Sequence, residues 1–337
     1  MSNILMWIKD KLPYLIMAAI VLGLVNGYYN EVSFLKGFLT PVVFLMIYPM
    51  MINLKVTDVL TSFSEPKPVL LSLLVNFIIS PLIAYALSLI FFADYPMLTV
   101  GLVLIALIPT SGMTASWTGL ANGNMKSALI IMSTNLLLAI VLIPIYLKLL
   151  LGQVITIETM LVVWSLIKVV VIPLVLGDLT RRVLLSKYGQ KQFKKMKPNF
   201  AGVSATGVLM IVFIATSLKS KTILSDGEMV IKVLIPLIIY YGLILLISNA
   251  LGKKYLDYGN QVALIYGTTM RNLTIAMALT ISSLEGGLAV FLIAVGYLLQ
   301  VPSAALYMRY LNWRSKKTDS VEETGEERPS ANAYSSS

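Results

Sequence analysis

The chain has 337 residues, of which 58% are hydrophobic and only 12% are charged. Soluble domains carry about 25% charged residues, so this composition excludes an ordinary soluble domain and indicates a polytopic membrane protein. The formal net charge is +10. The basic residues lie between apolar runs, which the positive-inside rule explains better than nucleic-acid binding does. The absence of Cys and His excludes thiolate and imidazole metal sites and the nucleophiles that need these side chains.

A membrane-spanning helix needs about 20 mostly apolar residues, and ten segments of the sequence meet this requirement. In chain order they are 13–29, 34–54, 68–92, 96–124, 125–150, 159–180, 199–218, 229–251, 260–283 and 288–312. The sequence therefore predicts an all-α membrane protein with ten transmembrane helices.

Basic residues concentrate in alternate loops, which places both termini in the cytoplasm by the positive-inside rule. The densest cluster, 181–197, is predicted to be a cytoplasmic linker. Before it, residues 1–180 hold the first five-helix repeat and the helix that starts the second. After it, 198–313 complete the second repeat, and 314–337 are predicted to be a disordered cytoplasmic tail. Five helices per half give the halves opposite orientations, which is the inverted-repeat arrangement of many secondary transporters.

Two of the ten segments are interrupted by residues that disfavour a continuous helix. The segment 96–124 breaks at 109–112, where the sequence is Pro-Thr-Ser-Gly, and 260–283 breaks at 267–272. Proline removes a backbone donor and glycine lowers helix propensity. Broken backbone at membrane depth is tolerated where it is buried in protein or lines a cavity, and broken helices hold substrate and ion sites in secondary transporters. We therefore predict that the interruptions form a transport site.

Two cations lie inside predicted spans. Arg271, at the second interruption, has two interpretations. It is either functional, as an anion-binding cation or an internal substitute for a bound metal ion, or a structural partner for backbone carbonyls. Lys168 either pairs with the solute or extends its side chain to the membrane interface. No carboxylate lies deep in a span, and Asp178 comes closest. This arrangement suits an anionic or neutral polar solute better than an organic cation.

Hydroxyl and amide side chains cluster at both interruptions. A single Ser or Thr at a helix contact often bonds only backbone or a neighbouring helix, whereas an unpaired buried amide is unfavourable. Half-helix N-termini at the interruptions would favour an anionic group. The predicted substrate- or ion-binding residues are Asn76, Pro109, Thr110, Ser111, Gly112, Thr114, Ser116, Asn135, Gly267, Thr268, Thr269, Arg271 and Asn272, with Lys168 as a further candidate. No catalytic residue, metal site or cofactor is expected.

Over about residues 10–312 the sequence resembles the bile acid:sodium symporter superfamily, which also contains the arsenite efflux permeases. The motifs that carry the resemblance are Pro109-x-x-Gly112 followed by Gly123-Asn124, Asn76-Phe77-x-x-x-Pro81, Met270-Arg271-Asn272 and Met46-Ile47-Tyr48-Pro49. The resemblance implies ten helices in a panel and a core domain, with broken helices 4 and 9 crossing at the substrate and ion site.

The sequence departs from that superfamily at the ion site. Of the sodium ligands in helices 4 and 5 that the resemblance implies, Thr114 keeps one. The other positions are occupied by Ala115, Ala128 and Met132. Gly267 stands where the symporters have a glutamate, and Arg271 stands where they have a glutamine ligand. Sodium coupling is therefore disfavoured and a proton is the other candidate. The cysteine of the arsenite permeases is also absent.

We predict a secondary active transporter of the plasma membrane, not an enzyme, that moves a small anionic solute by alternating access. The alternative is an arsenite or antimonite efflux permease that acts without a cysteine. An intramembrane enzyme is disfavoured because the chain has no His or Cys and the spans hold no buried acid pair. A channel or sensor built on the same fold is a further class. The predicted partners are the solute, an organic anion or a metalloid oxyanion, and the lipid bilayer, but not nucleic acid.

Overall fold

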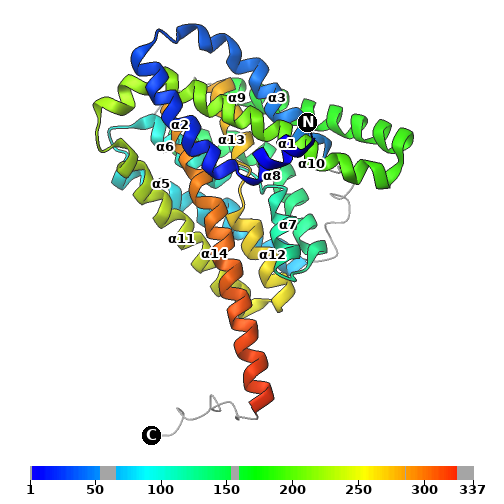
Figure 1. Ribbon diagram of the computed structural model, residues 1–337. Coiled ribbons are helices and arrows are strands. Elements are labelled where there is room, and N and C mark those ends of the chain that lie inside the picture. Colours follow the sequence, from blue (N-terminus) through cyan, green and yellow to red (C-terminus); the bar gives the residue numbers. More distant parts are fainter. Residues whose placement is uncertain (1, 54–65, 153–158, 285, 325–337) are drawn as a thin grey trace, which may run out of the picture.

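The computed structural model describes residues 2–53, 66–152, 159–284 and 286–324. These residues form helices and one isolated backbone bridge, and they contain no β-strand (Figure 1). The helices are α1 (Ser2–Asp10), α2 (Leu12–Tyr29), η1 (Ser33–Phe38), α3 (Leu39–Ile52), α4 (Pro66–Leu74), η3 (Val75–Ile79), α5 (Ser80–Phe91), α6 (Pro96–Leu107), α7 (Met113–Leu120), α8 (Met125–Leu151), α9 (Thr159–Leu166), η4 (Ile167–Val171), α10 (Ile172–Ser225), α11 (Met229–Tyr255), α12 (Tyr258–Thr269), α13 (Leu273–Ser283) and α14 (Leu288–Thr324).

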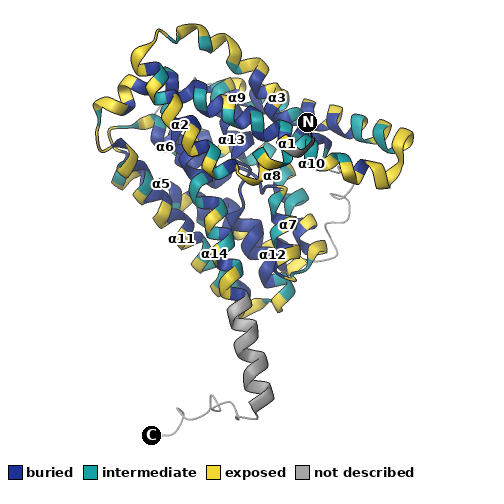
Figure 2. Cartoon of the chain, in the orientation of Figure 1, coloured by how far each residue is buried: buried dark blue, intermediate teal, exposed yellow. Residues whose placement is uncertain are grey.

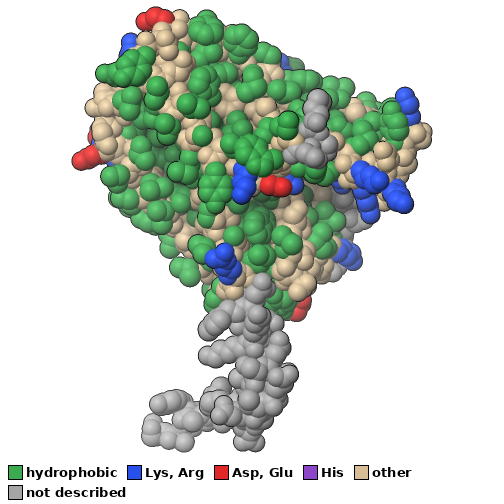
Figure 3. All heavy atoms as spheres, viewed as in Figure 1, with side chains coloured by type: hydrophobic (Ala, Val, Ile, Leu, Met, Phe, Trp, Pro, Cys, Tyr) green, Lys and Arg blue, Asp and Glu red, His purple; other side chains and the backbone are tan. Residues whose placement is uncertain are grey.

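Helix α10 contains a reversal that the sequence does not reveal. Gly189 has φ of +74°, a conformation that glycine adopts without steric strain. The segment 181–197, predicted as a linker, is thereby folded into a helical hairpin that projects from one side of the molecule (green in Figure 1). Basic side chains gather over this hairpin (Figure 3).

The helices pack in two groups. In the first group, α10 lies along α2 and α3, and α1 lies against α10. Glycines permit this close approach, because a Cβ at Gly27 would lie 1.9 Å from the Ser217 carbonyl oxygen and one at Gly207 would lie 2.8 Å from Met46 Cα. In the second group, α6 packs against α5 and α14, and α12 packs against α11, α8 and α7. Helices α6, α7 and α12 therefore belong to the second group, whereas α13 packs against α14 and also against α3 of the first group.

The surface and the interior are both largely apolar, as expected for a protein surrounded by lipid. Figure 2 shows the buried residues in the middle of the bundle, and Figure 3 shows hydrophobic side chains over most of the visible face. Seven helical stretches in the described parts of the chain are long and apolar enough to cross a membrane, and α6 and α13 are shorter apolar helices. These features indicate a multi-pass membrane protein.

The predicted segments coincide with helices, but their boundaries differ in places. The sixth and seventh segments form one continuous stretch, Met160–Ser225, because the hairpin joining them is helical. Helix α14 continues to Thr324 and so includes 314–324, where the sequence predicts a disordered tail. The remainder of that tail, 325–337, and residue 54 of the second segment lie outside the described residues.

Candidate functional site

The backbone at the two interruptions, between α6 and α7 and between α12 and α13, is paired. Thr110 and Arg271 form an antiparallel bridge. The Ser111 N–H donates to the Met270 carbonyl at 2.7 Å, and the Asn272 N–H donates to the Pro109 carbonyl at 2.9 Å. Each interruption therefore satisfies backbone groups that the other leaves without a helical partner, which is the requirement for non-helical backbone inside a membrane protein. We call this place the crossing.

Arg271 is the charged group at the crossing, and its residue is only 1% exposed. Its Nη2 donates to Ser80 Oγ at 2.9 Å, and Nη1 donates to the Ile108 carbonyl at 3.4 Å. Ser80 Oγ lies 2.7 Å from the Tyr240 hydroxyl. No carboxylate pairs with Arg271 among the described residues, and its Nε has no hydrogen-bond partner there. The guanidinium is thus held by neutral oxygens through Nη1 and Nη2, while its Nε has no partner in the described structure.

Gln300, on α14, holds the backbone of Arg271. Its Oε1 accepts the Arg271 N–H at 2.9 Å, and its Nε2 donates to the Arg271 carbonyl at 3.0 Å. The Tyr241 hydroxyl also donates to Oε1, at 3.3 Å. The sequence analysis missed Gln300, Ser80 and Tyr240. A signal for Gln300 was present, since it is a lone amide inside an apolar segment, as Asn76 is.

Asn76 lies in η3, a π-helical turn whose cause can be read from the sequence. Pro81 lacks the N–H that an α-helix would direct to the Phe77 carbonyl, and the Tyr146 hydroxyl donates to that carbonyl instead. Asn76 Nδ2 donates to Asn135 Oδ1 at 2.6 Å and to the Gly267 carbonyl at 3.0 Å. The π turn therefore places Asn76 directly against the interrupted helix α12.

Asn135 completes this amide pair from α8. Its Nδ2 donates to Ser72 Oγ at 3.2 Å and to the Ile131 carbonyl at 2.8 Å. Asn135 is thus fully engaged, whereas Asn76 Oδ1 is buried and has no hydrogen-bond partner among the described residues. The sequence offers no reason to distinguish the two asparagines. In the described structure only Asn76 has a side-chain acceptor, Oδ1, without a hydrogen bond.

Three unpartnered polar atoms belong to the crossing: Asn76 Oδ1, Thr110 Oγ1 and Arg271 Nε. Thr110 pairs with Arg271 through the backbone bridge. Asn76 and Ser80 are four residues apart, and they bond Gly267 and Arg271 respectively, which are also four residues apart. A buried polar group without a partner costs about 1–3 kcal/mol. These three atoms of the described structure are therefore buried without a hydrogen bond.

Other predicted residues at the interruptions serve the local structure. The Thr114 hydroxyl donates to the Tyr266 carbonyl at 3.1 Å, and the Thr269 hydroxyl donates to the Ile265 carbonyl at 2.7 Å. Thr268 Oγ1 lies 2.7 Å from Ser248 Oγ, and Asn272 Oδ1 accepts from Ile275 N–H at the start of α13. These contacts are the common use of hydroxyls and amides at helix ends and contacts.

Not every predicted residue lies in the buried centre. Ser111 is buried, and its Oγ accepts the Met113 N–H at 3.3 Å, within its own turn. Gly112 and Ser116 are exposed, because the chain leaves the centre as α7 begins. Lys168 is also exposed, as expected for a side chain that extends along the surface rather than into the crossing.

A separate ionic cluster lies outside the crossing, where α6 and α11 begin. The Asp226 carboxylate accepts from the Tyr95 hydroxyl at 2.5 Å and from Lys232 Nζ at 2.9 Å. The hydrogen bond from Tyr95, followed by that from Lys232, holds the pKa of Asp226 below its ordinary value. This cluster fixes the beginning of the interrupted helix α6 to the beginning of α11.

Helices interrupted at a buried polar centre are typical of membrane transporters. The model of the sodium bile acid symporter family matches residues 40–226, more than half of the chain. The chain therefore belongs to that family, which confirms the resemblance found in the sequence motifs.

Similarity to curated proteins extends over most of the chain. It is 25% identical to the arsenical-resistance protein Acr3 of Alkaliphilus metalliredigens, with 77% of each chain covered. It is 23% identical to Acr3 of Corynebacterium glutamicum, with 91% of this chain and 90% of that protein covered. It is also 23% identical to a probable chloroplastic sodium/metabolite cotransporter of rice, over 68% of this chain and 52% of that protein. These relatives support membership of a transporter family rather than an enzyme class.

Proposed function

We propose that this protein is a secondary active transporter that carries a small anionic solute across the plasma membrane by alternating access. The observation that supports this most directly is Arg271, a buried cation with no carboxylate partner in the described parts of the chain and with an unused Nε donor. An uncompensated charge inside a membrane protein is unfavourable and marks a solute or ion pathway by default. An anionic solute at the crossing would supply the missing counter-charge.

The remaining free atoms narrow the chemistry of the solute. Arg271 Nε can donate to an anionic oxygen, and the Thr110 hydroxyl can donate or accept. Asn76 Oδ1 can only accept, and therefore needs a donor on the solute. A solute that carries both an anionic oxygen and a hydroxyl group, such as a protonated oxyanion or a hydroxylated organic anion, fits this set. A fully deprotonated anion would face Asn76 Oδ1 without a hydrogen bond.

The proposed coupling does not use sodium. Thr114, the sodium ligand that the family pattern retains, donates its hydroxyl to the Tyr266 carbonyl, and Gly267 brings no carboxylate. A hard cation prefers anionic oxygen ligands, which this part of the chain lacks. A proton is the remaining candidate, and the protonation state of the solute itself would be the simplest way to carry it.

The proposed cycle moves the two packing groups against each other. The group of α1, α2, α3 and α10 would form one body, and the group that holds the crossing would form the other. The proposed architecture has ten spans in two inverted five-helix repeats, with both termini in the cytoplasm. If the two repeats exchange conformations, the inward-facing state becomes the outward-facing state. In this proposal Arg271 stays at the crossing while access to it alternates.

The second candidate function is efflux of arsenite or antimonite. Two relatives that this chain matches over most of its length are named arsenical-resistance proteins. The chain has no cysteine, so binding would depend on hydrogen bonds between the hydroxyl groups of the metalloid and the atoms of the crossing. Asn76 Oδ1 and Thr110 Oγ1 suit such a hydroxylated species.

Counterflow in proteoliposomes tests both candidates. Purified protein is reconstituted, loaded with one solute of a panel of hydroxylated organic anions, inorganic oxyanions and arsenite, and assayed for exchange with and without sodium. We expect saturable exchange of an anion that does not require sodium. Exchange of arsenite alone would favour the second candidate, a steep sodium requirement would contradict the proposed coupling, and a continuous current would indicate a channel.

A further inference from the structure

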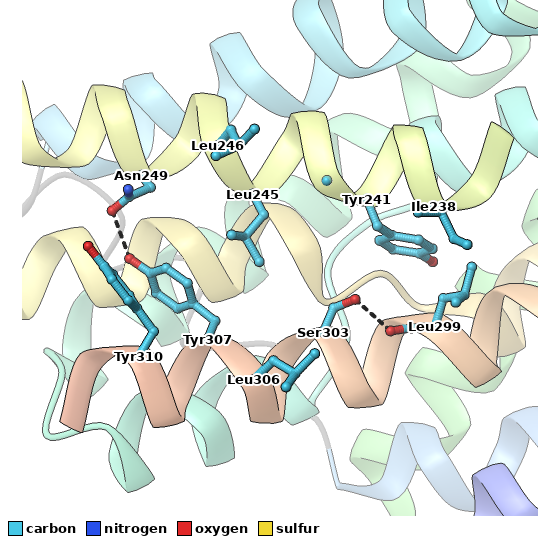
Figure 4. A pocket seen from close by; sticks show the side chains of 11 residues that line it. Ile238, Tyr241, Leu245, Leu246, Asn249, Leu299, Ser303, Leu306, Tyr307 and Tyr310 are labelled. Atoms are coloured by element: carbon cyan, nitrogen blue, oxygen red, sulfur yellow. Dashed lines mark hydrogen bonds between the residues drawn. The ribbon is translucent and has the colours of Figure 1, made fainter. Parts of the chain in front are cut away.

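A groove of about 590 Å³ lies on the outer surface between α11 and α14, and one end of it is lined by Tyr241, whose hydroxyl contacts Gln300 beside the crossing. Figure 4 shows Tyr241 and Ile238 at one end and Tyr310 and Asn249 at the other. Both helices that form the groove belong to stretches long and apolar enough to cross a membrane. Its exposed apolar walls are those expected of a surface that faces the bilayer, and only its Tyr241 end adjoins the crossing.

The groove exists because two small residues face each other across it. A Cβ at Gly242 would meet no atom within 4 Å, so the space beside α11 is open. Ser303 on α14 turns its hydroxyl back to the Leu299 carbonyl at 2.7 Å and leaves the groove without a free donor at that point. Leu246 and Leu306, which are 62% and 64% exposed, add apolar walls. An extended hydrocarbon chain fits such a surface.

One end of the groove is basic. Lys253 Nζ donates to the Tyr310 hydroxyl at 3.4 Å and lies 5.9 Å from the centre of its ring. Lys254 follows in the same last turn of α11. Among the residues with described side chains, no Asp or Glu pairs with either lysine, and the nearest acid in the sequence, Asp257, caps α12 through Asn260. Tyr310 thus joins an apolar groove to the basic end of α11, where Lys253 contacts it.

We infer that this groove binds an anionic phospholipid, with an acyl chain between α11 and α14 and its phosphate at Lys253 and Lys254. A zwitterionic lipid can place the same acyl chain in the groove. Its headgroup, however, carries a positive charge beside the phosphate, which weakens the attraction to the lysines. Each basic residue near a membrane surface favours an anionic lipid by about fivefold. The inference does not depend on which solute the crossing carries, because the lipid binds a different face of the protein.

The absence of Cys in the chain allows a single reporter to be placed in the groove. Leu306→Cys is labelled with a small fluorophore, and the full-length protein is reconstituted in vesicles that contain brominated phosphatidylglycerol or brominated phosphatidylcholine. We expect half-maximal quenching at a mole fraction of phosphatidylglycerol that is at least about fivefold lower than the mole fraction of phosphatidylcholine needed for the same quenching. Lys253→Gln combined with Lys254→Gln should abolish this preference, and Gly242→Leu should fill the groove and reduce quenching by both lipids.

Matched controls separate the groove from general lipid contact. Val141→Cys on α8, at a residue that is 60% exposed, should report no preference between the two lipids. Gly37→Leu also places a side chain in open space, but should leave quenching at the Leu306→Cys reporter unchanged. Size-exclusion chromatography and circular dichroism verify that each variant is folded. Equal quenching by the two lipids at the groove, a preference that survives the lysine substitutions, or no effect of Gly242→Leu would overturn the inference.

Discussion

The two helix interruptions at the crossing differ in charge, in burial and in what holds their backbone. The first, 108–112, has only neutral side chains and leads to the exposed Gly112. The second, 270–272, is wholly buried and carries Arg271, whose backbone is held by Gln300. Their backbones pair with each other, so each needs the other for its hydrogen bonds. The first interruption thus brings hydroxyl and backbone groups to the crossing, and the second brings the charge.

The largest expected effect comes from removing that charge. Arg271→Gln should lower solute exchange by about 100-fold, since a hydrogen bond to a charged group contributes up to about 3 kcal/mol. The fold should survive, because a neutral amide needs no counter-charge. Lys168→Gln is the control and should leave exchange unchanged, because Lys168 is exposed. Counterflow at the wild-type rate in the Arg271 variant would contradict the proposal that Arg271 binds the anionic solute.

Gln300→Leu tests the support of the second interruption. The change leaves the Arg271 carbonyl without its partner, and the free energy of unfolding should fall by about 2 kcal/mol. Denaturant or thermal unfolding in detergent measures this difference. Ser303→Ala, one turn further along α14, removes a hydroxyl that bonds only its own helix and should change stability little. Equal stability of the two variants would show that the Gln300 contacts do not hold the interruption.

Thr110→Val tests the first interruption with almost no change of shape. The Thr110 hydroxyl is buried and unpartnered in the described structure, so its removal should leave stability unchanged or raise it by about 1 kcal/mol. Exchange should nevertheless fall by about tenfold if the hydroxyl bonds the solute. Thr280→Val removes a buried hydroxyl that bonds the Ala276 carbonyl on α13 and should leave exchange intact. A matching loss in both variants would indicate a packing effect rather than solute binding.

The smallest expected effect concerns the ionic cluster that anchors α6, the helix leading to the first interruption. The pKa of Asp226 is lower in the folded protein, chiefly because Tyr95 and then Lys232 donate to it. The cluster therefore stabilises the fold above the pKa of an unfolded Asp, about 3.9, and this contribution disappears as the pH falls through the lower folded pKa. The melting temperature of wild type should exceed that of Asp226→Asn at neutral pH and approach it in acid. A difference that is independent of pH would contradict this account.

Much of this protein follows from its sequence, because the signals are local. Apolar run lengths predict the helices, Pro109 and Gly112 predict the first interruption, and motifs at both interruptions predict the family that the comparisons confirm. Arg271 and Asn76 stand out because a polar side chain in an apolar segment is conspicuous without any knowledge of its neighbours. The division into ten spans and two inverted repeats stays a prediction.

Only the tertiary structure decided which side chains meet. Ser80, Tyr240 and Gln300 come from three helices far apart in the sequence, and Ser80 and Tyr240 look ordinary in their own segments. Ser116 was predicted together with the other candidates and Lys168 as a further one, and helix packing places both at the surface. A hydrogen bond between distant segments depends on which helix faces pack together. The spacing of residues within one segment does not predict that packing. The sequence therefore determined which polar groups lie in apolar segments, and the packing of the helices determined which of them have no partner in the described structure.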